Sequence, residues 1–375
     1  MHERHVIDRL AGQGIDTVVS LPCDKTKDLC FLFPKRLRTV VLTREEDGIG
    51  ISAGLALAGG RPALHMQSSG LGNSLNAVMS LTVTFDLPLP ILASWRGVYH
   101  ESIPAQVPFN RALPGVLDAL DIPYTIIRDE TEAGLIDAVI ENAYGEMRPH
   151  VALIVPSFWE GPGDVCTPAE SPLPPRSRKS LLEYHRTIRE PGMTRFAAIR
   201  VIADLLEGEL VVANIGVPSK ELYAARDRPE NFYMLGSYTQ ATPIGLGLAL
   251  QSGRDVVVLD GDGSLLGSAV LPVVAAEAPA NLTVVCLDNG AFGSTGNQPT
   301  SAYGQVDMEL LAIAAGIRNT AKAHTPEEIR EAWEARGRGP AFIHIVLKPG
   351  NAPVPNVPYT PEEIRNRFMG SLQRV

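Results

Sequence analysis

The amino-acid sequence predicts an α/β protein made of two doubly wound parallel-sheet domains. Short runs of apolar and β-branched residues alternate with helical patterns along the whole chain, as in parallel sheets covered by helices. The length of 375 residues exceeds that of one ordinary domain, and hydrophobic residues make up 45% of the chain. An internal repeat also relates the first half of the chain to the second. Together these observations favour two packed domains of the same architecture.

A proline-rich linker and a series of expected strands define the domains. Residues 161–178 hold five prolines and no apolar periodicity, which indicates an extended connector. We therefore expect a first domain over residues 1–160, a linker over 161–192, a second domain over 193–350, and a C-terminal tail with a short helix over 351–375. The expected strands lie at residues 17–21, 39–42, 62–66, 89–93, 124–127, 151–155, 210–213, 232–235, 255–259, 282–287 and 342–347.

The internal repeat aligns residues 54–70 with residues 247–263. The two segments share 7 of 17 residues without a gap, at an offset of 193 positions. At the same offset residues 95–97 fall on residues 288–290, and each group follows an apolar strand. Open α/β sheets bind ligands at the carboxyl ends of their strands. Copies that differ at those ends therefore predict a ligand site shared between them.

Composition and charge exclude several classes of function. The formal net charge is −9 and no long basic run occurs, which argues against a nucleic-acid partner or an anionic membrane. No apolar run approaches the ~20 residues of a membrane span, and the charged N-terminus lacks a signal-peptide core, so we expect a cytoplasmic protein. The four cysteines are scattered, so neither a disulfide framework nor a structural zinc site is expected.

Polar residues follow two strands of the second half. Residues 260–264 (DGDGS) come directly after one strand, and residues 288–291 (DNGA) come at the end of the next. Glycines let the backbone approach a phosphate closely, and the amides that open a helix favour negative charge. Asp262 and Asn289 offer hard oxygen ligands from neighbouring strand ends, which suit Mg²⁺ or Ca²⁺. A lone GDG would indicate only a turn, whereas the pair predicts a metal-bound phosphate.

This pair of motifs resembles the cofactor signature of thiamine diphosphate enzymes. The resemblance implies a pyrimidine-binding domain, then a diphosphate-binding domain, with no middle domain. It also implies that Asp262, the Asn289 side chain and the Ala291 carbonyl bind the Mg²⁺ that holds the diphosphate. Asp288 departs from the family's usual asparagine at a position that does not bind the metal. Cofactor contacts are expected from Gly70, Asn73, Gly236, Ser237, Tyr238, Gly261, Gly263 and Ser264.

A glutamate of the first domain is the expected catalytic residue. In thiamine diphosphate enzymes such a glutamate hydrogen-bonds N1′ of the aminopyrimidine, which promotes removal of the C2 proton of the cofactor. Glu45, Glu46 and Asp47 precede a helix of small residues, and the family spacing to Ala53 selects Glu45. The alternative interpretation is that these three acids only favour the positive end of the helix dipole.

Longer segments resemble the sulfopyruvate and phosphonopyruvate decarboxylase group over nearly the whole chain. These segments are residues 66–73 (MQSSGLGN), 94–97 (SWRG), 218–223 (PSKELY) and 288–296 (DNGAFGSTG). Residues 21–25 and 103–108 look like the sulfopyruvate branch. The resemblance implies that thiamine diphosphate and Mg²⁺ serve to convert 3-sulfopyruvate to sulfoacetaldehyde and CO₂, as in coenzyme M biosynthesis. Phosphonopyruvate decarboxylation is the nearest alternative.

A dianionic substrate needs cationic and hydrogen-bonding groups in this acidic protein. Arg96 follows a strand, and its guanidinium can form a two-pronged contact with either anion. For His100 an exposed loop position is at least as good an interpretation, and for Lys25 a solvated surface position is the better one. His65 lies in an apolar strand and is expected to be a core histidine. The weaker substrate candidates are His100, Lys25, Ser294, Thr295 and Gln298.

Tyr238 and Thr239 leave a third function open. The family usually has Met, Leu or Ile where this chain has Tyr238, because an aliphatic side chain props the cofactor, and Gly where it has Thr239. Tyrosine is bulkier and its hydroxyl needs a partner. A catalytically impaired thiamine diphosphate-binding protein is therefore a further alternative. A nicotinamide dehydrogenase is least favoured, because no GxGxxG follows the first strand of either half.

The resemblance also implies an oligomer. Glu45 and Asp262 must face one cofactor, and family members usually hold it between two chains. We therefore expect a homodimer or a homotetramer with the cofactor between chains. Many sulfopyruvate decarboxylases have the two domains as separate subunits, which here would be fused. The other expected partner is a small-molecule 2-oxo acid with a second anionic group.

Overall fold

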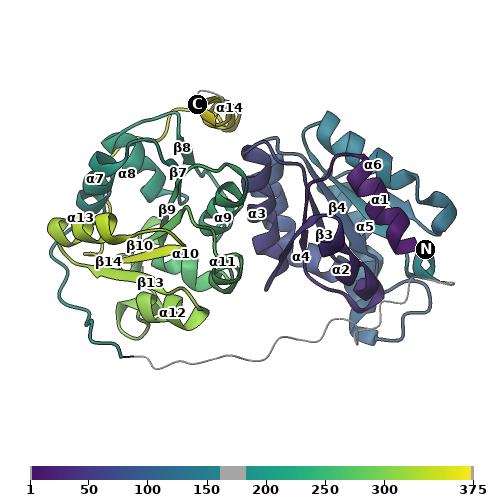
Figure 1. Ribbon diagram of the computed structural model, residues 1–375, viewed down its shortest axis with the longest axis horizontal. Coiled ribbons are helices and arrows are strands. Elements are labelled where there is room, and N and C mark those ends of the chain that lie inside the picture. The colour runs from purple at the N-terminus through teal and green to yellow at the C-terminus, as the bar shows by residue number, and fades with distance from the viewer. Residues whose placement is uncertain (1, 161–182, 373–375) are drawn as a thin grey trace.

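The computed structural model describes residues 2–160 and 183–372, which form two parallel six-stranded sheets covered by helices (Figure 1). Residues 161–182 of the expected linker lie outside the described residues. Residues 183–192 contain no helix or strand and lie along the second domain, where Arg186 pairs with Glu309 and Arg189 with Glu328. No helix in the described parts of the chain is both long and apolar enough to cross a bilayer.

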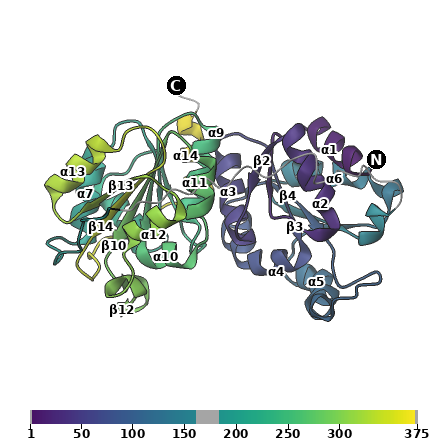
Figure 2. The ribbon, with the colours of Figure 1, turned by 60° about the horizontal axis from the view of Figure 1, so that its bottom comes forward.

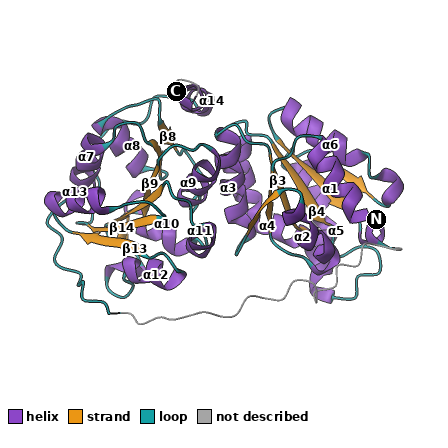
Figure 3. Cartoon of the chain, in the orientation of Figure 1, coloured by secondary structure: helices purple, strands orange, loops and turns teal. Residues whose placement is uncertain are grey.

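The first sheet has the strand order β2-β1-β3-β4-β6-β5. Its strands are β1 (Thr17–Ser20), β2 (Arg38–Val41), β3 (Pro62–Gln67), β4 (Leu89–Ser94), β5 (Tyr124–Ile127) and β6 (Pro149–Ile154). The helices of this half are α1 (His2–Gly12), α2 (Lys27–Leu32), α3 (Glu45–Leu57), α4 (Ser68–Ala77), α5 (Val107–Ala119) and α6 (Leu135–Gly145). The central strands β3, β4 and β6 are apolar along most of their length, as expected for strands covered by helices on both faces (Figure 3).

The second sheet has the strand order β13-β14-β10-β9-β7-β8. Its strands are β7 (Leu210–Ala213), β8 (Asn231–Tyr233), β9 (Val256–Gly261), β10 (Leu282–Asp288), β13 (Asn319–Ala323) and β14 (Ala341–Val346), and β11 (Ala291–Phe292) pairs with β12 (Gln298–Pro299) beside it. The helices are α7 (Arg195–Leu205), α8 (Val217–Ala225), α9 (Ala241–Gln251), α10 (Asp262–Gly267), α11 (Leu271–Glu277), α12 (Met308–Ala315), α13 (Pro326–Ala335) and α14 (Pro361–Leu372).

The two sheets share one topology. Matched in chain order, β2-β1-β3-β4-β6-β5 corresponds to β8-β7-β9-β10-β14-β13, so each strand has a counterpart in the other half. The predicted internal repeat and the α/β class are thereby confirmed. Sequence analysis missed β13, a half-buried edge strand with the sequence NTAKA. Alanine, asparagine and lysine are poor strand formers, so no pattern indicated this element.

Helices α3 and α9 join the two domains (Figure 2). Every residue of α3 is buried, and α9 is buried except near its C-terminus. Beyond the three acids in the first turn of α3, both helices are almost entirely apolar on all sides, which is typical of a helix surrounded by protein. Gly50 lies beside Pro243 and Gly60 beside Gln251, so the helices run in the same direction. Their N-termini therefore lie at the same end of the helix pair.

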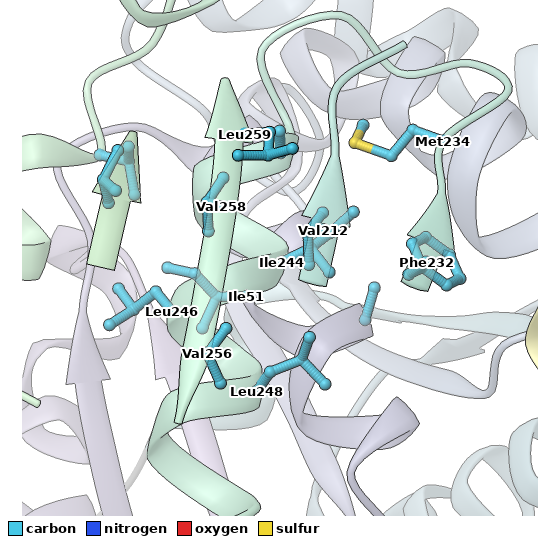
Figure 4. Packing of buried hydrophobic residues seen from close by; sticks show 14 of the residues in the cluster. Ile51, Val212, Phe232, Met234, Ile244, Leu246, Leu248, Val256, Val258 and Leu259 are labelled. Atoms are coloured by element: carbon cyan, nitrogen blue, oxygen red, sulfur yellow. The ribbon is translucent and has the colours of Figure 1, made fainter. Parts of the chain in front are cut away.

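One hydrophobic cluster extends through both domains. It includes strands of both sheets together with α3 and α9. Figure 4 shows Ile51 of α3 among Leu246 of α9 and Val256 of β9. The C-terminal helix α14 adds a second bridge, because Arg365 on this helix donates hydrogen bonds to the carbonyls of Phe85 and Asp86 in the first domain. The domains thus pack as one body in this chain.

Candidate active site

Most of the site residues predicted in the second domain line one cavity of about 360 Å³ at the carboxyl edge of its sheet. The predicted residues that line it are Tyr238, Gly261, Asp262, Gly263, Ser264, Asn289, Ala291, Ser294 and Thr295. Sequence analysis did not identify the remaining lining residues, which are Arg195, Asn214, Ile215, Pro218, Leu287, Phe292 and Gly293. The cavity follows from the topology, since β7, β9 and β10 are adjacent strands.

Asp262 is the buried carboxylate of this cavity. It is 2% exposed, and its Oδ2 accepts a hydrogen bond from Oγ1 of Thr300, a residue that sequence analysis missed. Burial raises the pKa of Asp262 to about 7, and the charge of Asp288 adds to the shift. A cation at this carboxylate would offset both unfavourable contributions, because it stabilises the ionised form.

Asn289 and Ala291 supply two further oxygens. The Asn289 amide lies 2.9 Å from the Ala291 carbonyl oxygen and 3.3 Å from Nη1 of Arg195. When the amide nitrogen faces Ala291, it donates to the Ala291 carbonyl and the amide oxygen accepts from Arg195. When the amide is rotated by 180°, its oxygen instead lies beside the Ala291 carbonyl oxygen. One carboxylate, one amide oxygen and one carbonyl oxygen are ligands that Mg²⁺ accepts, with phosphate oxygens and water as the others. These residues fit the predicted metal.

Arg195 is a buried cation behind the predicted metal ligands. It is 5% exposed, its Nε donates to Oε2 of Glu221 at 2.8 Å, and its Nη2 donates to Asn351 at 2.8 Å. Glu221 is fully buried and offsets the charge of Arg195. The residue begins α7, far in sequence from either motif, so no local pattern could have indicated its place in the cavity.

Glu45 begins α3 and its carboxylate packs on Gly70 of α4. A Cβ atom at position 70 would lie 2.5 Å from Oε1 of Glu45, so a residue other than glycine would displace this carboxylate. Glu46 pairs with Arg44 at 2.8 Å. Within residues 2–160 and 183–372, the Glu45 carboxylate makes no hydrogen bond or ion pair, which leaves it available to a ligand.

Contacts between the domains surround the N-terminus of α3. Asp47 accepts hydrogen bonds from Oγ of Ser268 at 3.0 Å and from the Ala269 amide at 3.1 Å. On the adjoining part of the interface, the hydroxyls of Ser80 and Ser237 are 2.7 Å apart. Glu45 itself is not among the residues that line the cavity of the second domain. One chain nevertheless brings both parts of the predicted site to the same interface.

Tyr238 stands at the edge of the cavity in a constrained segment. Its hydroxyl donates to the Gly263 carbonyl at 2.5 Å, and the residue is 43% exposed. Its neighbours Ser237 and Thr239 have φ angles of 63° and 76°, a conformation that residues other than glycine seldom adopt. Such strain persists where the surrounding structure holds it and often marks functional segments.

Arg96 is buried between two carboxylates. Its Nε and Nη2 donate to Glu101 at 2.6 and 3.1 Å, and its Nη1 donates to Asp24 at 2.6 Å. The side chains of Arg96 and Glu101 are 3% and 4% exposed, whereas Asp24 is 62% exposed. The hydrogen bond from Arg96 holds the pKa of Glu101 down at about 2. Of its two carboxylate partners, only Asp24 is exposed to solvent.

The remaining candidates are scattered. His65 is buried between Ser20 and Thr26, and burial lowers its pKa to about 4, which confirms the core histidine. His100, with φ 55°, is an exposed loop residue, and Lys25 is exposed in a short 3-10 helix (Asp24–Thr26). The remaining exposed candidates are Asn73, on α4, and Gln298, which accepts a hydrogen bond from Thr295.

Sequence comparisons agree with this arrangement. Residues 2–136 match the N-terminal TPP binding domain of thiamine pyrophosphate enzymes, and residues 215–345 match the C-terminal TPP binding domain. A solved structure of a putative thiamin diphosphate-dependent enzyme from Mycobacterium smegmatis superposes with a TM-score of 0.71 over 93% of this chain and 99% of the other, at 15% identity. The chain belongs to the thiamine pyrophosphate enzymes.

Curated relatives place the chain among the decarboxylases of this family. Sulfopyruvate decarboxylase of Methanosarcina acetivorans is 46% identical over 99% of this chain and 97% of its own length. Phosphonopyruvate decarboxylase of Streptomyces viridochromogenes is 33% identical over 96% and 92%. Sulfopyruvate decarboxylase subunit beta of Methanothermobacter thermautotrophicus is 44% identical over 48% of this chain and 96% of its own length. The chain is a fused, thiamine diphosphate-dependent decarboxylase.

Proposed function

We propose that this chain decarboxylates 3-sulfopyruvate to sulfoacetaldehyde and CO₂ with thiamine diphosphate and Mg²⁺, as a step of coenzyme M biosynthesis. The observation that carries the choice of substrate is the 46% identity to a sulfopyruvate decarboxylase along almost the whole chain. Identity to a phosphonopyruvate decarboxylase is 33%, which makes that activity the second candidate. In this proposal the cytoplasm is the place of the reaction.

The cofactor, when bound, supplies the electron sink that lets the carboxylate of a 2-oxo acid leave as CO₂. Asp262, Asn289 and the Ala291 carbonyl would hold Mg²⁺ against the diphosphate in the cavity of the second domain. Gly263, which lines the same cavity, leaves its backbone open to the phosphates because it has no side chain, and it also packs under the Phe292 ring, which a Cβ there would meet at 2.6 Å. The diphosphate would thus be held in one domain.

Glu45 would hold a proton at N1′ of the aminopyrimidine. Two features support this role: its carboxylate has no polar partner among the described residues, and it lies at the interface with the second domain. Its neighbours Glu46 and Asp47 are already paired, so the first turn of α3 offers one free acid. A carboxyl group positioned within hydrogen-bond reach of the ring nitrogen can transfer a proton to or from it.

Arg96 would receive one anionic group of the substrate. An incoming sulfonate or carboxylate would take the place of the exposed Asp24 on Nη1, while Glu101 keeps the guanidinium in its orientation. Planar guanidinium groups suit such exchange between oxyanions. His100, Ser294 and Thr295 remain further candidates for substrate contacts.

The experiment is a decarboxylation assay of the purified full chain. We expect CO₂ release from 3-sulfopyruvate that requires both thiamine diphosphate and Mg²⁺, with a kcat/KM above that for phosphonopyruvate. A higher kcat/KM for phosphonopyruvate would instead establish the second candidate. Tight cofactor binding without turnover of either substrate would point to a binding protein in which Tyr238 impairs catalysis.

A homodimer or homotetramer is the second part of the proposal. Relatives that consist of separate alpha and beta subunits support it, because in them the two domains associate without a linker. Helix α3 of one chain is able to pack on α9 of a second chain as these helices pack here within one chain. Mixing inactive Glu45→Gln and Asp262→Asn chains tests where the site forms. Regained activity would indicate a cofactor between chains, and none would indicate a site within one chain.

A further inference from the structure

Asp288 is a buried carboxylate immediately before the proposed metal ligand Asn289. It ends β10 and is 4% exposed. Its Oδ1 accepts a hydrogen bond from the Gly290 amide at 3.0 Å, and its Oδ2 lies 2.7 Å from Nε2 of His344. One carboxylate therefore ties the turn after β10 to the neighbouring strand β14, where His344 pairs in register with Cys286.

His344 is held on its other side as well. The imidazole is fully buried, and its Nδ1 lies 3.5 Å from Oδ1 of Asp307. Asp307 caps α12 through hydrogen bonds from the Glu309 and Leu310 amides at 3.0 and 3.3 Å, and it pairs with the buried Lys322. The imidazole is thus fixed between the end of one strand and the start of a helix.

Charge balance favours this arrangement. Burial lowers the pKa of His344, but its hydrogen bond to Asp288 and the nearby carboxylate of Asp307 outweigh burial and raise it. An unpaired carboxylate would be costly at a position that is 4% exposed. Asp288 lies near Asp262, which must be ionised to bind a cation. The His344 imidazole offsets the negative charge of Asp288 and so reduces the repulsion between the two carboxylates.

The turn that follows Asp288 carries two of the proposed metal ligands. Gly290 has φ 63°, and a Cβ atom there would meet the Tyr303 ring at 2.7 Å, so the turn is tightly packed. The Gly290 amide lies between Asn289 and Ala291, so by holding this amide Asp288 restrains the backbone from which the Asn289 side chain and the Ala291 carbonyl extend. A looser turn would leave these two oxygens free to point away from Asp262.

We infer that Asp288 and His344 form a clamp that positions Asn289 and Ala291 for the metal. Both are positioning residues, because neither is placed to bind the cation itself. The inference rests on the metal site of the proposed function. It also gives a physical role to an aspartate at a position where this family usually has asparagine.

Direct metal binding tests the clamp. Mn²⁺, whose unbound fraction is measured by electron paramagnetic resonance, is titrated into the full chain with saturating thiamine diphosphate. His344→Leu removes the hydrogen bond to Asp288, and we expect the Kd for Mn²⁺ to rise about 10- to 100-fold, as for other groups that orient metal ligands. His344→Gln places an amide N–H near the position of Nε2, and we expect it to regain most of the affinity.

A matched variant and a second substitution complete the experiment. His150→Gln removes another buried histidine, which hydrogen-bonds Thr125 in the first domain, and should leave the Kd unchanged. If His344→Leu does not fold, Asp288→Ala carries the test with the same expected loss. Wild-type Kd values in these variants, with only a lower melting temperature, would overturn the clamp. Absence of Mn²⁺ binding to the wild type would instead refute the metal site itself.

Discussion

Gly54 and Gly247 touch each other where α3 crosses α9, and each occupies the other's position in the internal repeat. A Cβ atom on Gly54 would lie 2.1 Å from the Ile244 carbonyl oxygen, and one on Gly247 would lie 2.0 Å from that of Ile51. The two contacts are equivalent at the repeat offset, so a pseudo-twofold axis passes through the helix crossing. This close approach brings the N-termini of α3 and α9 to one interface.

Gly247→Ala should weaken the contact between the domains. The new methyl group would collide with backbone, which cannot move aside cheaply, and overpacking of this kind costs about 1–3 kcal/mol. We expect a lower free energy of unfolding in urea and lower cofactor affinity. Gly115→Ala is the matched control, because Gly115 lies in α5 with open space around it and the substitution should stabilise the helix by about 0.5–1 kcal/mol. Equal effects of both changes would contradict the close packing.

Asp47 should make the interface between the domains more stable in acid. Burial raises its pKa to about 6, whereas an unfolded aspartate has a pKa of about 3.9, so the folded state binds the proton more tightly. This contribution, about 3 kcal/mol, is fully present below pH ~4 and is lost as the pH rises through 6.

The Asp47→Asn variant should lack that part of the pH dependence. The measurement is the free energy of unfolding in urea between pH 4 and 7, with Asp255→Asn as the control because Asp255 is an exposed aspartate. An identical pH profile for wild type and Asp47→Asn would show that the buried carboxylate is not responsible.

Asp24→Asn should lower the KM for the substrate. The change removes the carboxylate that occupies Nη1 of Arg96, and exposed ion pairs contribute at most about 1 kcal/mol, so KM should fall by up to about fivefold. Arg96→Gln should raise KM while thiamine diphosphate binding stays intact. Steady-state kinetics on both variants check this, and an unchanged KM in Arg96→Gln would remove Arg96 from the substrate site.

Tyr238→Phe should weaken cofactor binding. The substitution removes the hydrogen bond to the Gly263 carbonyl and keeps the ring, so about 1 kcal/mol, or a roughly fivefold higher Kd for thiamine diphosphate, is expected. Calorimetric titration measures the Kd. Tyr303→Phe serves as the control, because Tyr303 is 67% exposed, packs on Gly290 and does not line the cavity. Tighter binding by Tyr238→Phe would indicate that the tyrosine obstructs the cofactor.

Much of the fold was predictable because it depends on local patterns. Apolar runs indicated the strands of both sheets. The repeat between residues 54–70 and 247–263 indicated that the two domains share one architecture, and the matching strand order of the two sheets confirms it. The edge strand β13 escaped because it is half-buried and carries no apolar run. The metal motif was visible because Asp262 and Asn289 each follow a strand directly.

The residues that surround the motif could not be predicted in the same way. Thr300 and Arg195 reach the cavity from segments with no pattern of their own, and their contacts with Asp262 and Asn289 exist only after folding. Arg96 was recognised as a cation at a strand end, but its pairing with Glu101 depends on the path of a loop. Long-range pairings of this kind leave no periodic signal.

The central measurement compares the turnover of Glu45→Gln with that of Glu46→Gln. Both variants are assayed for CO₂ release from 3-sulfopyruvate, and thiamine diphosphate binding is measured by calorimetry in each. We predict that Glu45→Gln lowers kcat by about 10²- to 10⁴-fold with the cofactor still bound, because proton transfer by a positioned group contributes that much. We predict that Glu46→Gln, whose carboxylate pairs with Arg44, keeps most of its activity. Full turnover by Glu45→Gln, or an equal loss in Glu46→Gln, would contradict the account.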